Sequence, residues 1–158
     1  MRLCVDYRKL NEVTKKDRYP LPIMEDLFDA LAGAQVFSSL DLASGYWQVE
    51  VAEEDREKTA FVVPNGLYEF QTMPFGLSNA PATFQRLMAE VLKDLIPQRC
   101  LVYMDDVIVH GKNEKDHMDN LMRVFDRLQE VGLKLQQKNA FFSPKRSDSQ
   151  GTSLVPTV

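Results

Sequence analysis

Two adjacent carboxylates, Asp105 and Asp106, are the residues of this chain best placed to do chemistry. They follow Tyr103-Met104 and stand between two short apolar runs, 100–102 and 107–109, whose composition predicts two strands meeting at a tight turn. Because a buried carboxylate is costly without a partner, this pair needs solvent, hydrogen bonds or a cation. Two interpretations are open at this point: an Asp-rich hairpin tip, or a divalent-metal site, since Mg²⁺ is held by a few carboxylates together with substrate phosphates.

A third carboxylate, Asp41, ends an apolar run over 36–41 that we expect to be a strand. An antiparallel sheet with helices on one face would bring Asp41 to the same end of the sheet as the Asp105-Asp106 pair. Three carboxylates there could hold two divalent ions ~3.5–4 Å apart, as in enzymes of phosphoryl transfer. Such a site needs no histidine nucleophile, so we expect His110 and His117 to be surface residues.

The elements that must position these carboxylates follow from periodicity and turn residues, and together they predict an α+β fold. We expect a loop without helix from residue 8 to Pro22. The expected helices are 23–33, 52–58, 82–95 and 113–132. The expected strands are 3–7, 36–41, 47–51, 59–63, 67–71 and those flanking Asp105-Asp106, with a closing hairpin over 134–142. The inward face of the last helix is expected to carry Met118, Leu121, Met122, Phe125 and Leu128.

The bulk properties fit one globular domain: 158 residues, of which 44% are hydrophobic and 27% charged. No apolar run approaches ~18 residues and the N-terminus is charged too early for a signal peptide, so we expect an intracellular protein without contact with membranes. Cys4 and Cys100 are expected to be reduced packing residues, because their spacing matches no zinc site. We expect residues 145–158, which lack periodicity, to form a disordered tail after a domain over 1–144.

The charge distribution is ambiguous about nucleic acid. The net charge is −4, whereas nucleic-acid-binding proteins usually have a basic surface. The bases nevertheless cluster near the two ends of the chain, at Arg8, Lys9, Lys15, Lys16 and Arg18 and at Lys134, Lys138, Lys145 and Arg146.

An ordered set of motifs makes the interpretation specific. The chain resembles the reverse transcriptase domain of gypsy-type LTR retrotransposons, which is related to retroviral Pol. The matching segments are Cys4-Val5-Asp6-Tyr7-Arg8-Lys9-Leu10-Asn11, Tyr19-Pro20-Leu21-Pro22, Leu40-Asp41-Leu42-Ala43-Ser44-Gly45-Tyr46-Trp47-Gln48, Glu57-Lys58-Thr59-Ala60-Phe61, Met73-Pro74-Phe75-Gly76-Leu77, Asn79-Ala80-Pro81-Ala82-Thr83-Phe84-Gln85 and Tyr103-Met104-Asp105-Asp106.

The resemblance implies a polymerase palm, an antiparallel sheet backed by helices, with part of the fingers. It implies RNA-directed DNA synthesis with two Mg²⁺ ions, or Mn²⁺ in their place, on an RNA or DNA template with its primer and with deoxynucleoside triphosphates. The chain would be part of a Pol polyprotein. Asp41, Asp105 and Asp106 would be the metal ligands.

The same resemblance implies roles for other residues in substrate binding. Arg2 would bind the triphosphate, which the Leu42 carbonyl and the Ser44-Gly45 backbone would help to seat. Tyr46 would lie under the sugar and exclude a 2′-hydroxyl, and Phe75 would pack near the nucleotide, where retroviral relatives have Gln. Lys138 would protonate the leaving pyrophosphate. Tyr46 and Phe75 could instead be packing aromatics.

The chain also departs from the family pattern. The second basic residue that contacts the triphosphate, the thumb and the RNase H domain are expected to be absent, and Asn139 stands where a Cys usually follows Lys138. An inactive remnant of a retroelement, which folds or binds without turnover, is therefore the competing interpretation. A carboxylate-metal nuclease or phosphatase would explain the acids but leaves Tyr46 and the Asn79-Ala80-Pro81 helix entry without a role.

Overall fold

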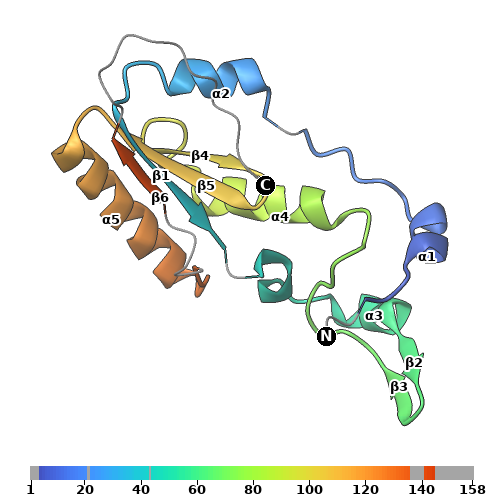
Figure 1. Cartoon of the computed structure of the whole chain (residues 1–158). Coiled ribbons are helices and arrows are strands. Elements are labelled where there is room, and N and C mark those ends of the chain that lie inside the picture. Colours follow the sequence, from blue (N-terminus) through green and yellow to red (C-terminus); the bar gives the residue numbers. More distant parts are fainter. Residues whose placement is uncertain (1–3, 21, 43, 136–140, 145–158) are drawn as a thin grey trace.

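The computed structural model describes residues 4–20, 22–42, 44–135 and 141–144, arranged as in Figure 1. The helices are α1 (Arg8–Val13), α2 (Met24–Ala30), α3 (Glu53–Arg56), α4 (Ala80–Val91) and α5 (Glu114–Glu130), with 3₁₀ turns η1 (Gly45–Gln48) and η2 (Glu57–Thr59). The strands are β1 (Val36–Asp41), β2 (Phe61–Val63), β3 (Gly66–Tyr68), β4 (Cys100–Tyr103), β5 (Asp106–Gly111) and β6 (Phe141–Pro144).

A four-stranded antiparallel sheet forms the centre of the molecule, in the order β4-β5-β1-β6. The two middle strands, β1 and β5, come from distant parts of the chain, and the consecutive strands β4 and β5 form a hairpin. Strands β2 and β3 form a separate two-stranded hairpin that projects away from the sheet (Figure 1).

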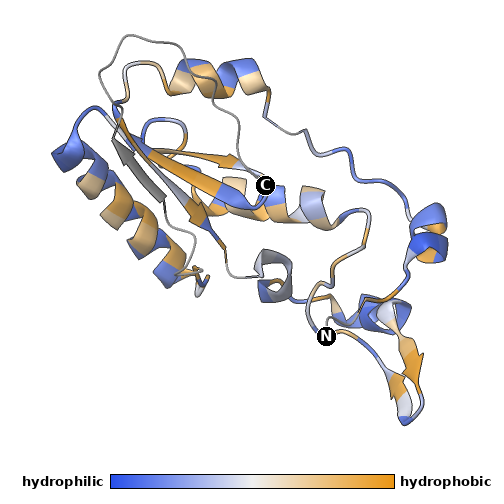
Figure 2. Ribbon diagram, in the orientation of Figure 1, coloured by the Kyte–Doolittle hydropathy of each residue, from blue (hydrophilic) through white to orange (hydrophobic). Residues whose placement is uncertain are grey.

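Helices α4 and α5 cover one face of this sheet with a shared apolar core. Side chains alternate across a strand, and the register places Leu40, Val107 and Val102 in one row on the covered face. The core they join includes Phe84 and Met88 of α4 and, from α5, Leu121, Val124 and Leu128. Figure 2 shows β4 and β5 as mainly apolar and α5 as divided into an apolar and a polar side. Burial of this apolar surface is the main force that holds the helices on the sheet.

The next row of the register belongs to the opposite face, which these two helices leave uncovered. It contains Asp41 of β1, Asp106 of β5 and Tyr103 of β4, each one residue away from a core position. The same alternation that buries Leu40 and Val107 therefore presents the two acids on the open side of the sheet.

Helices α4 and α5 confirm the periodicity argument with one correction. Asn113 caps α5, because its side chain accepts a hydrogen bond of 2.9 Å from the Asp116 N–H. Leu121 and Leu128 are buried as expected, but Met118 and Met122 are exposed. The buried face of the helix is rotated toward His117, Asn120 and Val124.

The segment before Pro22 was predicted wrongly. Residues 4–7 form no strand, and a helix, α1, occupies part of the expected loop. The Tyr7 N-cap and the bond from the Thr14 N–H to the Leu10 carbonyl delimit this helix of six residues. Its charged sequence lacks the apolar stripe that would have identified it.

Between β1 and α4 the predictions hold in part. Residues 47–51 were expected to be a strand, but the chain forms η1 followed by a single bridge between Glu50 and Thr72. The expected helix over 52–58 is present as α3 and η2, and the expected hairpin as β2 and β3 with shorter strands. Of the closing hairpin, Leu135 bridges Leu42 and β6 pairs with β1, while residues 136–140 lie outside the described residues.

Both histidines are buried, contrary to the expectation that they lie on the surface. His110 and His117 are 7% and 3% exposed, and each has a polar partner: the Pro97 carbonyl and the Ser38 hydroxyl respectively. Cys100 is buried as expected, whereas Cys4 is exposed, and both are free thiols. In the part of the chain that the structure describes, none of the helices has the length and apolar character needed to cross a membrane.

Candidate active site

The candidate site lies at one end of the sheet, where β1 ends and the β4–β5 hairpin turns. Asp41 is the last residue of β1, and Asp106, the first of β5, is its direct partner across the strand pair. Asp105 is in the two-residue turn between Tyr103 and Asp106. Met104, in the same turn, has a φ of +54°, which is unusual for a residue other than glycine.

Tyr46 connects the first turn of η1 to the Asp105-Asp106 pair. Its hydroxyl donates a hydrogen bond to the Asp105 carboxylate. Its ring packs against Phe84, with centroids 5.6 Å apart, and against Phe75, at 5.1 Å. The ring is therefore fixed from both sides, and the hydroxyl is directed at the acidic group.

The acids affect one another's ionisation. Burial raises the pKa of Asp105, and the Asp41 carboxylate raises it further, although the Tyr46 hydrogen bond acts in the opposite direction. Burial likewise raises the pKa of Asp106, with added repulsion from Asp41 and Asp105. Burial and the neighbouring Asp105 raise the pKa of Tyr46 to about 12. The protein thus brings negative charges together at a cost that a cation would remove.

One oxygen of the site has no protein partner among the described residues. Asp105 Oδ1 is buried and accepts no hydrogen bond from them, which is uncommon for a charged oxygen. However, within the described residues no three His, Cys, Asp or Glu side chains are gathered closely enough to hold a metal ion by themselves. The donors are hard oxygens, as Mg²⁺ and Mn²⁺ prefer, but they complete no coordination shell without a further ligand.

The turn after β1 lies beside the acids. The Leu42 carbonyl accepts a hydrogen bond of 3.1 Å from the Gly45 N–H, so one of its lone pairs is already used. Ser44 is exposed and left-handed, with a φ of 53°. Gly45 is buried against Phe84, where an added Cβ would be 2.8 Å from the ring. A side chain at this position would require the Phe84 ring to move.

The loop that carries Phe75 is held by the N-terminal segment. Asn11 donates to the Gly76 carbonyl at 2.8 Å and accepts from the Ser78 N–H at 2.8 Å, and Asn79 donates to the Lys15 carbonyl at 2.9 Å. Phe75 itself is partly exposed and contacts Trp47 as well as Tyr46. These bonds across more than sixty residues explain how a loop without regular structure can place an aromatic ring beside Tyr46.

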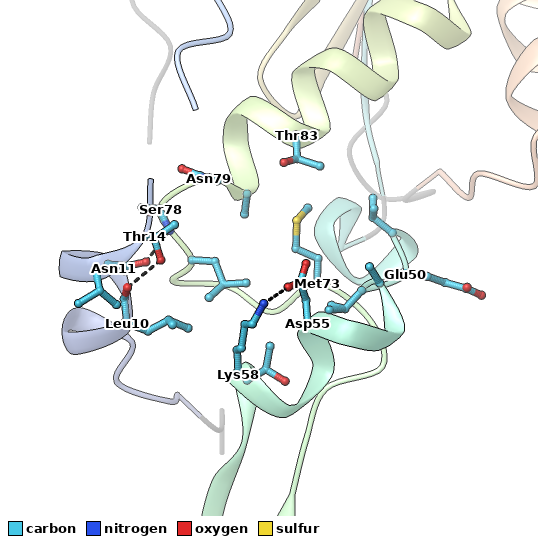
Figure 3. Close-up of a pocket in the computed structure, with 17 residues that line it drawn as sticks. Leu10, Asn11, Thr14, Glu50, Asp55, Lys58, Met73, Ser78, Asn79 and Thr83 are labelled. Carbon is cyan, nitrogen blue, oxygen red and sulfur yellow. Dashed lines mark hydrogen bonds and ion pairs between the residues drawn. The ribbon is translucent and has the colours of Figure 1, made fainter. Parts of the chain in front are cut away.

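A cavity of about 490 Å³ lies next to this loop but away from the acids. Figure 3 shows Asn11, Ser78 and Asn79 at one side of it and the paired Asp55 and Lys58 at another. Its lining is mainly apolar and includes none of the three acids. We therefore place the candidate chemistry at the open sheet end and not in this cavity.

The structure brings together five of the predicted residues: Asp41, Asp105, Asp106, Tyr46 and Phe75. Leu42, Ser44 and Gly45 are in the adjoining turn. Arg2 and Lys138 lie outside the described residues, so their roles stay predictions.

Sequence reasoning missed Gln85, which contacts the backbone of the hairpin turn. Its signal was present: it stands three residues before Met88, on the buried side of α4, as a polar residue among apolar ones.

Comparison with known proteins identifies the family. The family described as "Reverse transcriptase (RNA-dependent DNA polymerase)" matches residues 1–148. This chain belongs to the reverse transcriptase family, and its antiparallel sheet backed by helices is the α+β arrangement of a polymerase palm.

Its curated relatives are mostly much longer proteins. The chain is 44% identical over 155 residues to the retrovirus-related Pol polyprotein from transposon 297 of Drosophila melanogaster, covering 98% of this chain and 15% of that protein. It is 46% identical over 142 residues to the Pol polyprotein from transposon gypsy of the same organism, covering 89% and 14%. An RNA-directed DNA polymerase homolog of Oenothera berteroana is 51% identical over 110 residues, covering 70% of this chain and 78% of the homolog.

Solved structures agree in fold. The foamy viral protease-reverse transcriptase in complex with an RNA/DNA hybrid has a TM-score of 0.78 and 26% identity, over 88% of this chain and 19% of that one. A second form of the same enzyme, in complex with double-stranded DNA, has a TM-score of 0.80 and 25% identity, over 92% and 25%.

Proposed function

We propose that this chain is the palm, with part of the fingers, of an RNA-directed DNA polymerase from a retrotransposon Pol polyprotein. It would transfer a deoxynucleotide to the 3′-hydroxyl of a primer on an RNA or DNA template. The observation that carries the proposal is the position of the acids at one end of the sheet, where Asp41 and Asp106 are cross-strand partners and Asp105 is in the adjoining turn, in a chain of the reverse transcriptase family. We assign residues 1–144 to this unit and 145–158 to a tail.

Divalent metal fits the donor set when substrate supplies part of the shell. Asp105 Oδ1 has no hydrogen-bond partner in the described part of the chain, and this oxygen and the raised pKa values of Asp105 and Asp106 favour a cation there. Since the acids alone complete no site, the triphosphate oxygens would complete it, as is usual for Mg²⁺. When bound, two such ions would neutralise the charge that develops on the attacking and leaving oxygens.

The remaining residues would position and select the substrate. Tyr46, held by Phe75 and Phe84, would lie against the sugar, and its fixed ring would clash with a 2′-hydroxyl. The Ser44-Gly45 backbone would help to seat the triphosphate. Arg2 would add a permanent positive charge to the triphosphate, and Lys138 would give a proton to pyrophosphate.

Calorimetry can test the site directly. We expect Mn²⁺ or Mg²⁺ to bind the chain weakly alone and at least about tenfold more tightly when a deoxynucleoside triphosphate is present, because its phosphates complete the shell. Asp41→Asn should remove most of this gain. Asp119→Asn, on the exposed side of α5, is the matched control and should keep it.

Polymerase activity is best tested with this chain inserted into one of its longer relatives. We would replace the homologous segment of the gypsy Pol polyprotein with this chain and measure primer extension on an RNA template. We expect extension that Asp41→Asn abolishes and Asp119→Asn preserves. A chimera that folds and binds metal with nucleotide, yet extends no primer, would contradict polymerase function and favour the inactive remnant.

A further inference from the structure

Gln85 is a buried polar residue that the proposed chemistry leaves without a role. It is 2% exposed on α4 and lies between Phe84 and Met88, both fully buried. An amide is costly to bury unless it is hydrogen-bonded, so its position calls for specific partners.

Its partners are two backbone groups of the β4–β5 hairpin. Gln85 Oε1 accepts a hydrogen bond of 2.7 Å from the Met104 N–H, and Nε2 donates to the Val102 carbonyl at 3.3 Å. Since a single amide bonds both groups, the Val102 carbonyl of β4 and the N–H of the following turn residue Met104 lie on the same side of the hairpin. Since β4 is an edge strand of the sheet, the amide takes the place of a neighbouring strand at this point.

The shorter of the two bonds reaches Met104, the residue immediately before Asp105. Met104 has a φ of +54°, a conformation that side-chain-bearing residues rarely adopt. A turn of this kind persists when surrounding contacts fix it. The bond from α4 to the Met104 N–H is such a contact, and it joins the hairpin turn to the core.

We infer that Gln85 is a positioning residue: its amide holds the Met104 turn so that Asp105 and Asp106 face Asp41. The consequence for metal and nucleotide rests on the proposed function, whereas the effect on the turn does not. Gln85 itself would contact neither substrate nor metal.

The test removes both hydrogen bonds with little change of side-chain length. In Gln85→Met, we expect the Met104 amide to exchange with solvent at least about tenfold faster and the amide resonances of Asp105 and Asp106 to shift. We expect the affinity for Mn²⁺ in the presence of a deoxynucleoside triphosphate to fall about 10–100-fold, the usual effect of losing a residue that orients metal ligands.

Asn120→Leu is the matched control. Asn120 is also a buried amide, 3% exposed, and its Nδ2 donates to the His110 carbonyl at 2.9 Å, at the far end of β5 from Asp106. This variant loses the same kind of bond to the same sheet. It should lose stability without moving the Asp105 and Asp106 resonances or the affinity for Mn²⁺ with nucleotide.

A second variant separates the two bonds and covers the case in which Gln85→Met does not fold. Gln85→Glu keeps an acceptor for the Met104 N–H but loses the donor to Val102. We expect it to protect the Met104 amide better than Gln85→Met and to lose less affinity. Equal losses in the two variants would overturn the assignment to the Met104 bond.

Two outcomes distinguish this inference from the proposed function. If the wild type binds Mn²⁺ with nucleotide and Gln85→Met binds equally well with an unchanged hairpin, the inference is wrong and the function stands. If the wild type binds no Mn²⁺ with nucleotide, the proposed function fails, and accelerated exchange at Met104 in Gln85→Met still supports the positioning role.

Discussion

At the scale of the single residue, the fold disfavours the ionised form of Asp105, whereas the proposed metal binding requires it. Burial and the negative charge of Asp41 raise its pKa, so the fold is less favourable to the ionised carboxylate than water is. A proposed metal ligand must be ionised at neutral pH all the same. Residues at functional sites commonly reduce stability in this way.

We predict that Asp105→Asn stabilises the chain in the absence of metal. A group whose folded pKa is raised adds stability below its unfolded pKa and loses it as pH rises through the folded pKa, so the ionised form costs free energy at pH 7. Because the side chain is partly solvated, the gain should be modest, a few tenths to about 1 kcal/mol. Urea unfolding at pH 7 measures it. A loss of stability would mean that Asn cannot replace the carboxylate as acceptor for Tyr46.

Two variants of Tyr46 should show whether this residue selects the sugar of the incoming nucleotide. In the polymerase chimera, Tyr46→Ala should raise the ratio of ribonucleotide to deoxynucleotide incorporation by roughly tenfold or more, because the clash with a 2′-hydroxyl is removed. Tyr46→Phe keeps the ring between Phe75 and Phe84 but loses the hydrogen bond to Asp105. It should leave the ratio unchanged. Equal ratios in all three proteins would make Tyr46 a packing residue.

At the scale of the element, the long regular segments could be predicted from the sequence and the short irregular ones could not. Strand β1, the β4–β5 hairpin and the cap of α5 follow from local patterns. Helix α1 has no apolar stripe, and the alternation over 47–51 is real but supports only a single bridge to Thr72.

The orientation of α5 depended on a contact that no local pattern encodes. Gly111 lies so close to the start of the helix that an added Cβ would be 2.5 Å from the His117 backbone. This approach turns His117 inward, onto Ser38, and leaves Met118 and Met122 in solvent. The hydrophobic stripe alone favoured the methionines.

The candidate site could be predicted in its acids but not in its supports. The Asp105-Asp106 pair is conspicuous because aspartate is rare in apolar strands. That Asp106 lies directly opposite Asp41 is known only from the register of β1 and β5, which is a property of the tertiary structure. The position of Gln85 among buried apolar residues of α4 could have marked it as unusual, but its partner, the Met104 backbone nineteen residues away, could not be predicted from a pattern along the chain.

The turn between β1 and η1 should be intolerant of added volume. Gly45→Ala would place a methyl group 2.8 Å from the buried Phe84 ring, and we expect a loss of about 1–3 kcal/mol in the free energy of unfolding. Ser44→Gly, one residue earlier, should be neutral or slightly stabilising, because Ser44 is left-handed and exposed. Urea unfolding of both variants makes the comparison. Unchanged stability in Gly45→Ala would show that the ring can move aside.

At the scale of the whole molecule, His117 couples the helix layer to the sheet. It is buried in α5 and its Nε2 lies 2.8 Å from the Ser38 hydroxyl of β1. Burial lowers its pKa, and the neighbouring His110 lowers it further. The neutral imidazole is thus the form that fits between the two layers.

This coupling predicts a stability that declines in acid. A histidine with a lowered folded pKa contributes stability above its unfolded pKa of about 6.5, and this is lost as pH falls through the folded pKa. The stability advantage of the wild type over His117→Gln should therefore shrink between pH 7.5 and 5, by at most about 1.4 kcal/mol per pH unit. Using the difference between the two proteins removes the opposite contribution of Asp105 and Asp106. A constant difference across this range would show that the pKa of His117 is the same in the folded and unfolded chain, and it would contradict the lowered pKa.

The pairing of β1 with β5 also has a consequence for biosynthesis. Asp41 and Asp106 are direct partners although 65 residues separate them in the chain. At ribosomal speeds of ~5–20 residues per second, the synthesis of Asp106 follows that of Asp41 by roughly 3–13 s. During that interval both edges of β1 are unpaired, and such edges attract other strands. A nascent chain of this kind should therefore engage chaperones early, and it should acquire its acidic centre in one late step and not gradually.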